Sequence, residues 1–157
     1  SINDFFSNGG NQANLWRTLT NDEWNYLIGK RANASSKHGV GMVNGINGMI
    51  LLPDYWTLPS GLTFKAGVAD DYGYQYYQSV NNYTAAEWSQ MESAGAVFLP
   101  AAGARSGSDV LYVGYNGNYW SSTPYDETRA YDRYFFSYYY NSDRTGRNHA
   151  LSVRLVR

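Results

Sequence analysis

Two segments of the chain repeat one pattern of polar and apolar positions, reading T-x-x-E-W. In each, a threonine that can cap a helix is followed three residues later by a glutamate that can return a hydrogen bond to it, and an apolar face then begins at Trp24 or Trp88. The four capping residues are Thr20, Glu23, Thr84 and Glu87. This pattern predicts helices near residues 21–31 and 85–94, the second ended by Gly95.

Short apolar runs separated by turn residues predict strands. MILLP (49–53) and VFLP (97–100) each follow one predicted helix, and the later runs LYVGY, NYWSS, AYDRYFF and LSVRLVR also have strand length. Asn-Gly pairs favour two-residue hairpin turns, and they occur at 44–45, 47–48 and 116–117. We therefore expect hairpins at these three places.

The segment between the first apolar strand and the second helix has a different character. Residues 54–84 are polar, aromatic and rich in glycine, and they are predicted to form long loops. Two helices combined with short strands predict an α+β fold, formed as a single domain over residues 1–157. The abrupt start at SINDFFSNGG leads us to expect further sequence upstream.

Composition and charge narrow the classes of function. The chain carries a net charge of −1 with a pI near 6.0, so no overall positive field would recruit nucleic acid or a membrane surface. No apolar run has the length of a membrane span, and we expect no membrane insertion. The complete lack of cysteine excludes a disulfide scaffold, a thiol nucleophile and any Cys-ligated metal.

Catalytic and metal-binding patterns are weak. The two histidines, His38 and His149, have no nucleophile motif around them and make a poor zinc site. Asp54, Asp70 and Asp71 could contact calcium, but they lack EF-hand spacing, and acidic loop residues are commonly just solvated. We therefore predict no enzymatic activity, no bound metal and no cofactor.

The stretch RAYDRYFFSYYYNSDRTGRNH, residues 129–149, holds five tyrosines and two phenylalanines among charged and amide side chains. Strand alternation places Phe135, Ser137 and Tyr139 on one face, and we expect Phe135 to pack in the core together with Ala130. The opposite face would carry Asp132, Tyr134, Phe136, Tyr138 and Tyr140. A charged residue among rings is unfavourable in a core, so we predict that this face is exposed and binds a ligand. Core packing and an oligomer interface are the alternatives. Residues 141–149 are rich in loop formers, and we expect them to form a loop beside this face.

Five segments in order carry a resemblance to a known family: WRTLTNDEWNYL, GMILLPDYW, GAVFLPAAGARSG, GNYWSST and SVRLVR. They are similar to variable proteins of diversity-generating retroelements from gut bacteria and their phages, and the similarity runs from about Gly9 to Arg157. The resemblance implies a C-type-lectin-like fold, with two helices, short antiparallel strands and long loops. It also implies display on a bacterial cell surface or a phage particle. The layout also resembles the formylglycine-generating enzymes, which depend on cysteine.

In the retroelement family, reverse transcription randomises adenines of a C-terminal repeat, mainly in AAC and AAT codons. Such codons cannot become Lys, Gln, Met, Glu or Trp. Of these five residue types, Lys, Gln and Met do not occur in residues 111–157. Glu and Trp occur once each, as Glu127 and Trp120. The resemblance therefore implies a diversified region at about residues 113–150, in which the YWSS segment is scaffold.

The ligand-binding residues that this implies are Tyr115, Tyr125, Asp126, Tyr131, Asp132, Tyr134, Phe136, Tyr138, Tyr140, Asn141, Asp143, Arg144, Arg147, Asn148 and His149. Arg105 and Arg154 are expected to hold structural hydrogen bonds. The partner would be a protein or glycan ligand on a cell surface. Neither the identity of this ligand nor the oligomeric state of the domain follows from the sequence. Two other functions remain open: a lectin-like adhesin with fixed sugar specificity, and a cysteine-free relative of the formylglycine-generating enzymes.

Overall fold

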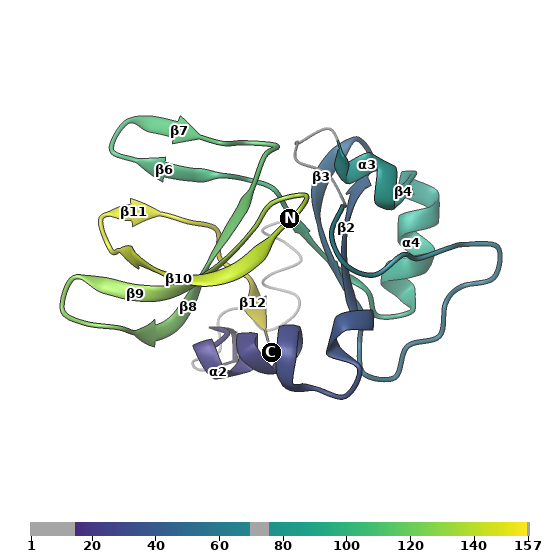
Figure 1. The fold of residues 1–157 in the computed structure, drawn as a ribbon, viewed down its shortest axis with the longest axis horizontal. Helices are drawn as coiled ribbons and strands as arrows, with labels where there is room; N and C mark the ends of the chain where they lie inside the picture. The colour runs from purple at the N-terminus through teal and green to yellow at the C-terminus, as the bar shows by residue number, and fades with distance from the viewer. Residues whose placement is uncertain (1–14, 70–75, 157) are drawn as a thin grey trace.

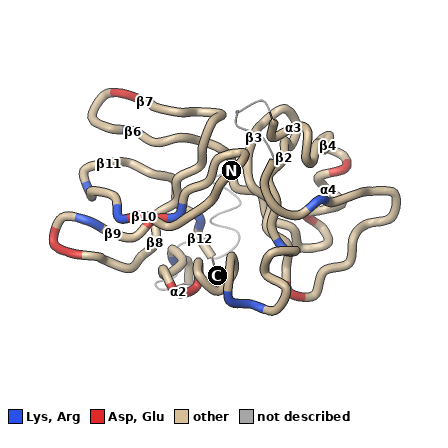
Figure 2. Tube along the Cα trace, viewed as in Figure 1, with Lys and Arg blue, Asp and Glu red and all other residues tan. Residues whose placement is uncertain are grey.

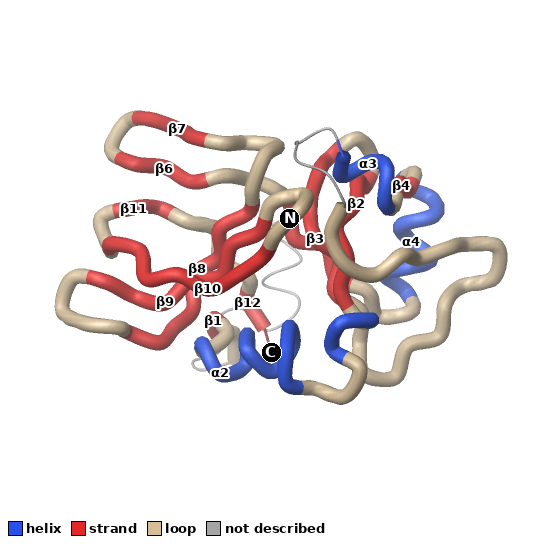
Figure 3. The backbone as a smooth tube through the Cα atoms, in the orientation of Figure 1, coloured by secondary structure: helices blue, strands red, loops and turns tan. Residues whose placement is uncertain are grey.

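The computed structural model describes residues 15–69 and 76–156, and in these parts the chain is α+β, as predicted. Within these residues, three short α-helices accompany strands arranged in four small sheets, most of whose pairings are antiparallel. The strands β6 to β11 gather on one side, while β2, β3, α3 and α4 occupy the other (Figure 1). Figure 3 shows the same division, with most of the blue helical segments away from the C-terminal strands.

The first predicted helix is confirmed. It comprises α2 (Asn21–Asn25) and a π-helical continuation, η1 (Tyr26–Lys30). The Glu23 N–H donates to the Thr20 hydroxyl at 3.2 Å, and the Thr20 N–H donates to the Glu23 carboxylate at 2.8 Å. Trp24 points into the core and is 1% exposed.

The second predicted helix is also confirmed, as α4 (Ala85–Ser93). Its capping box joins Thr84 and Glu87 by the same pair of hydrogen bonds. Gly95 follows the helix with a φ of +98°, a left-handed conformation that glycine adopts without strain.

One sheet contains β2 (His38–Val43), β3 (Ile46–Leu51), β4 (Asn82–Tyr83) and β5 (Val97–Pro100), in the order β4-β2-β3-β5. The Asn-Gly pair at 44–45 forms the predicted β2–β3 turn, with φ values of 47° and 80°. The pair at 47–48 lies inside β3, so the second predicted hairpin is wrong. A Cβ on Gly48 would lie 2.4 Å from the carbonyl oxygen of Leu99 in β5. This glycine therefore permits close strand packing instead of a turn.

Residues 54–84 are less irregular than predicted. The short helix α3 (Tyr77–Val80) lies in this stretch, and β4 follows it. Tyr77 is fully buried and its hydroxyl donates to the Tyr115 carbonyl at 2.7 Å, so the segment is anchored to the core. Asp70 and Asp71, two of the candidate calcium contacts, lie outside the described residues.

The main C-terminal sheet contains β8 (Gly117–Pro124), β9 (Arg129–Phe135) and β10 (Tyr140–Gly146), with β9 in the middle. The hairpin predicted at 116–117 is wrong, because Gly117 begins β8 and pairs with Phe135. A Cβ on Gly117 would lie 2.3 Å from the Phe135 ring. Packing against that ring therefore explains this glycine.

Two smaller sheets complete the described fold. One has the order β11-β6-β7, from β11 (His149–Ala150), β6 (Ala104–Ser106) and β7 (Asp109–Leu111). The other pairs β1 (Arg17–Thr18) with β12 (Leu155–Val156), which brings the two ends of the described chain together.

The core consists of two clusters of buried side chains. One joins helix α2 to the C-terminal strands, and its large buried rings are Trp24, Tyr77, Tyr119 and Phe135. The other lies between β3 and α4, around Ile50 and Met91. The aromatic C-terminal segment therefore contributes only part of its rings to the core.

Candidate functional site

The predicted ligand-binding residues are positioned mainly by the β9–β10 pair. The segment around residues 141–146, predicted as a loop, is a strand that pairs with β9 along its length. Tyr134 lies opposite Asn141, and Tyr131 lies opposite Arg144. The sequence missed this strand because Asn, Ser, Asp and Gly favour turns, and pairing with β9 overrides that preference.

The first group of site residues surrounds the end of the β8–β9 hairpin, and we call it the tip cluster. Its members are Tyr125, Asp126, Arg129, Tyr131, Arg144 and Arg147. The rings of Tyr125 and Tyr131 meet edge to face with their centres 5.3 Å apart. The guanidinium carbons of Arg129 and Arg144 lie 4.8 Å and 4.5 Å from the centre of the Tyr125 ring. Figure 2 shows acidic and basic positions gathered at this end of the hairpin.

Asp126 organises the hairpin end. Its carboxylate receives the Arg129 side chain, with 2.7 Å between the paired nitrogen and oxygen, and also accepts the backbone N–H of Thr128. These contacts, led by the hydrogen bond from Arg129, hold the pKa of Asp126 well below its usual range. The sequence analysis did not name Arg129. It lies three residues after Asp126, a spacing that fits a short turn leading into a strand.

The second group lies at the β9–β10 turn, and we call it the turn cluster: Tyr134, Phe136, Tyr138 and Tyr139. The Tyr134 and Phe136 rings meet edge to face at 5.8 Å, and Phe136 stacks with Tyr138 at 5.6 Å. Tyr134 also contacts Tyr139, with ring centres 6.0 Å apart. The four rings therefore form one continuous aromatic surface.

The predicted alternation fails at this turn. Strand β9 ends at Phe135, and the Phe136 N–H donates to the Tyr139 carbonyl at 2.6 Å, which closes a tight turn. Tyr139, assigned to the core side, is instead 43% exposed. Tyr134, Phe136 and Tyr138, predicted to be substantially exposed, are half-buried. They are half-buried because the rings of this cluster cover one another.

Asp132 is not exposed, which corrects the prediction. It is 2% exposed, because β9 is the central strand and Trp120 of β8 and Asp143 of β10 lie on either side. Burial raises the pKa of Asp132 to about 6, opposed by a hydrogen bond from Thr145 and reinforced by the charge of Asp143. One carboxylate oxygen, Oδ1, has no hydrogen-bond partner within the described structure.

Tyr140 was predicted to be exposed with the ligand residues, but it is half-buried. It packs against the core cluster that contains Trp24. Its ring meets the buried His38 ring edge to face, with the ring centres 4.7 Å apart. Burial lowers the pKa of His38, whose Nδ1 lies 2.9 Å from the Ala34 carbonyl. Tyr140 therefore belongs to the scaffold.

The remaining predicted residues lie apart from the ring contacts of both clusters. Tyr115 is 45% exposed, and its backbone carbonyl accepts a hydrogen bond from the Tyr77 hydroxyl. Asp143 and Asn148 are exposed, while His149 lies on β11 in the neighbouring sheet. Asn141 joins the turn cluster through a hydrogen bond to the Tyr139 hydroxyl.

The YWSS segment behaves as the scaffold that was expected. The Trp120 carbonyl accepts a hydrogen bond from the Trp24 indole at 3.4 Å, and Ser121 is buried. Arg133, which the sequence analysis did not single out, is also buried and donates to the Asn25 side chain at 2.6 Å. These contacts fasten β8 and β9 to helix α2.

Two arginines were expected to make structural hydrogen bonds. Arg105 does so, donating to the Gly107 carbonyl at 3.0 Å within the β6–β7 hairpin. Arg154 is exposed and has no hydrogen-bond partner among the described residues, so that expectation is wrong.

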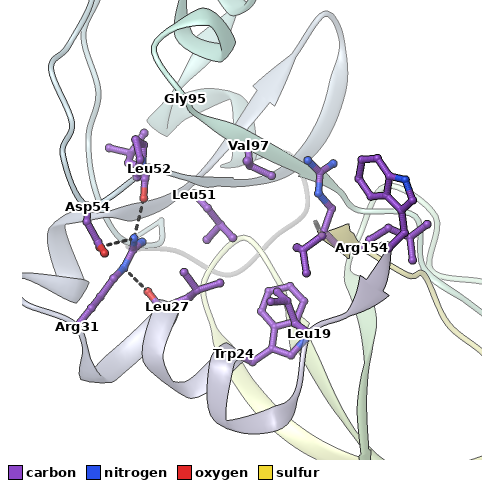
Figure 4. Close-up of a pocket in the computed structure, with 14 residues that line it drawn as sticks. Leu19, Trp24, Leu27, Arg31, Leu51, Leu52, Asp54, Gly95, Val97 and Arg154 are labelled. Atoms are coloured by element: carbon purple, nitrogen blue, oxygen red, sulfur yellow. Dashed lines mark hydrogen bonds and ion pairs between the residues drawn. The ribbon is translucent and has the colours of Figure 1, made fainter. Parts of the chain in front are cut away.

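A separate cavity of about 510 Å³ lies where α2, β3 and β12 meet (Figure 4). Its walls are mostly apolar, including Trp24, Leu27 and Val97. Arg31 closes one side, but its guanidinium already donates to the carbonyls of Leu27, Leu52 and Lys37 and to the Asp54 carboxylate. The cavity therefore has volume but few polar groups left to orient a ligand. The sequence carried no signal for it, because its walls come from distant segments.

Residues 15–69 and 76–156 contain no group of three or more His, Cys, Asp or Glu side chains that could hold a metal ion. None of the helices in the same residues is long and apolar enough to cross a membrane.

Comparison with known families places the chain in one of them. A family model described as a domain of unknown function (DUF8237) matches residues 70–156, which is more than half of the chain. The chain belongs to this family. The match extends over α4, the C-terminal strands and both aromatic clusters. Searches of curated proteins and of solved structures found no match.

Proposed function

We propose that this protein is a non-enzymatic ligand-binding module with a C-type-lectin-like fold. Its tip and turn clusters form the binding surface, and a diversity-generating retroelement varies them so that related proteins recognise different targets. The module is displayed on a bacterial cell surface or phage particle, and its partner is a protein or glycan on another surface.

One observation carries the proposal: most of the predicted ligand residues lie outside the core of the same segment. Of the fifteen residues implied by the resemblance, all of which are described, only Asp132 is buried. The buried residues interleaved with them are Asn116, Gly117, Tyr119, Ser121, Arg133, Phe135 and Ser137. Most of the proposed variable positions can therefore change while the packing stays the same.

The composition of the two clusters suits recognition. Tyrosine brings a large contact area with few torsions to order, and tyrosine and arginine are enriched among the residues that dominate binding energy. Tyr125 and Tyr139 are 39% and 43% exposed, so both keep accessible ring surface. The capped helices and small antiparallel sheets support the proposed fold class.

A library experiment tests the separation of the two sets. One library randomises the exposed positions Tyr125, Tyr139, Asn141, Arg144 and Asn148. The matched control randomises five buried positions, namely Tyr119, Ser121, Arg133, Phe135 and Ser137. Members of the first library should resist protease and retain a cooperative melt far more often than members of the second.

Selection of the first library against a set of bacterial surface proteins should then yield binders of different specificity. Equal fractions of folded members in the two libraries would contradict the separation. A library that folds but never yields a binder would contradict the binding function itself.

A lectin-like adhesin with fixed sugar specificity is the second candidate. It is favoured by the exposed tyrosine rings, since aromatic rings stack against the apolar faces of sugars. Binding to one glycan class on an array, unchanged among natural variants that differ at Tyr125 and Tyr139, would support this alternative. Variation of the target with those positions would support the diversified module.

A further inference from the structure

Arg144 is held against two aromatic rings on the outside of the main C-terminal sheet. Its guanidinium carbon lies 4.5 Å from the centre of the Tyr125 ring and 6.0 Å from that of Tyr131. The residue is exposed and lies directly opposite Tyr131 on the neighbouring strand. Contact with the rings limits the rotation of a long side chain that would otherwise move freely.

The other charges of the tip cluster are already engaged inside it. Asp126 accepts hydrogen bonds from the backbone of Thr128 and from both the backbone and side chain of Arg129. Arg147 donates to the carbonyls of Asp126 and Arg129 at 3.0 Å and 3.4 Å. Glu127 is the remaining exposed acid of the hairpin. These contacts hold the hairpin together and leave Arg144 as the cation available for a partner.

Arg144 has neither an ion pair nor a side-chain hydrogen bond within the described part of the chain. Its neighbour Asp143 accepts the backbone N–H of Arg144 at 2.8 Å, a contact that does not involve the guanidinium. A guanidinium that is oriented and unpaired presents a fork of N–H groups matching the two oxygens of a carboxylate.

We propose that the tip cluster recognises an acidic segment of a partner protein, with an aspartate or glutamate carboxylate bound by the Arg144 fork. This inference rests on the proposed binding function and specifies the chemistry of its ligand. The apolar part of the same segment lies against the Tyr125 and Tyr131 rings.

The number of available cations favours a carboxylate over a phosphate. Phosphate sites gather several donors around one dianion, whereas two of the three arginines here are engaged with Asp126 and with backbone carbonyls. A sugar ring is less suited to the tip, because the guanidinium groups of Arg129 and Arg144 already lie over the Tyr125 ring. The single planar guanidinium of Arg144, next to the Tyr125 and Tyr131 rings, suits the carboxylate of an acidic side chain.

The partner is recognised by its side chains and not as an added strand. Strand β10 is at the edge of its sheet, where an extended peptide could pair. The N–H groups of Ser142 and Arg144, however, already donate to the side chains of Asn141 and Asp143, at 2.8 Å in each case. This occupation of main-chain donors at an edge disfavours strand addition.

The test uses the whole 157-residue chain and an array of synthetic peptides. Each peptide with Asp or Glu in a neutral, tyrosine-containing background has a matched peptide with Asn or Gln. Phosphopeptides and sialylated glycans form two further arms. The variants are Arg144→Lys, which keeps the charge but loses the planar fork, and Arg144→Ala. The matched control is Arg154→Lys, a second exposed arginine without a hydrogen-bond partner among the described residues.

We expect a set of acidic peptides to bind at least about tenfold more tightly than their amide counterparts, with a preference that weakens as salt is added. Arg144→Ala should abolish the preference and Arg144→Lys should weaken it, both at an unchanged melting temperature, and Arg154→Lys should retain it. Equal binding of acid and amide peptides, an unaffected Arg144→Lys, or binding confined to the phosphopeptide or glycan arm would each overturn the proposal.

The variant Tyr139→Ala separates this inference from the proposed function. Where Tyr139→Ala weakens binding of some probe and Arg144→Lys does not, the binding surface stands and the carboxylate fork is wrong. Where no probe binds the native chain and neither variant changes any interaction, both proposals fail.

Discussion

Asp132 of β9 lies directly opposite Asp143 of β10, so two carboxylates project from the same face of the sheet, one buried and the other exposed. Burial and the charge of Asp143 raise the pKa of Asp132 to about 6, against the opposing hydrogen bond from Thr145. A carboxyl group whose pKa is higher in the folded state than in the unfolded state binds protons more strongly when folded. The free energy of unfolding therefore falls as the pH rises from about 4 to 6.

Replacing Asp132 with asparagine should stabilise the protein near neutral pH. Asp132→Asn removes the buried charge, and we expect a gain of about 2 kcal/mol at pH 7.5 that largely disappears by pH 4. Thermal unfolding of both proteins across this range measures the difference. Asp109→Asn, a change at an exposed acid of β7, is the control and should show no such dependence. A gain that is independent of pH would show that charge burial is not its cause.

Two adjacent tyrosines should respond in opposite ways to the same substitution. Tyr140→Ala should cost about 1–3 kcal/mol, because it removes a ring packed against His38 and the core. Tyr139→Ala should change stability by less than about 0.5 kcal/mol and weaken ligand binding, because this ring is exposed. Denaturant unfolding and a binding assay on both variants provide the comparison. Similar losses of stability would show that Tyr139 also belongs to the scaffold.

Tyr134 and Tyr138 give a less direct test of the same surface. Both are half-buried within the turn cluster, so the double change to alanine should lower the melting temperature moderately as well as weaken binding. Full unfolding at room temperature would indicate that these rings are core, whereas unchanged binding would remove them from the ligand surface.

Gly117 should not tolerate even a methyl group. A Cβ there would lie 2.3 Å from the Phe135 ring, so Gly117→Ala should destabilise the protein by about 1–3 kcal/mol. Gly29→Ala is the matched control, because no atom beyond its own helix backbone and chain neighbours lies within 4 Å of its added Cβ. That change should be neutral or stabilising by about 0.5 kcal/mol, since alanine favours helices. Equal effects on the two melting temperatures would contradict the packing explanation.

The diversification proposal makes a prediction about the gene. A near-copy of the last segment should lie close by, beside a reverse transcriptase. It should carry AAC or AAT codons at Tyr125, Asp132, Tyr134, Phe136, Tyr138, Tyr140 and Asn148. Sequencing the neighbourhood checks this. A template that differs from the gene at bases other than adenine would contradict diversification, and codons for Tyr119 and Phe135 should match in both copies.

Features that depend on a few neighbouring residues followed from the sequence. Both helices begin at the predicted capping boxes, because the Thr and Glu side chains satisfy backbone N–H groups only three residues away. The hairpin at Asn44-Gly45 also formed, since the left-handed backbone angles of such a turn are local preferences. Most tip-cluster members are among the ligand-binding residues that the family resemblance implies, and their binding role stays a prediction.

Tertiary contacts decided the features that depend on distant residues. The Asn-Gly pairs at 47–48 and 116–117 have the same composition as the true turn, yet both lie beside large rings that leave room only for glycine. Strand alternation through the aromatic segment stopped at Phe135, where the turn between β9 and β10 exposed Tyr139 and turned Tyr140 toward His38. Asp132 became buried because pairing placed strands on both sides of it. Local sequence determines which conformations each segment prefers, but only assembly of the sheet determines which side chains the neighbouring strands cover.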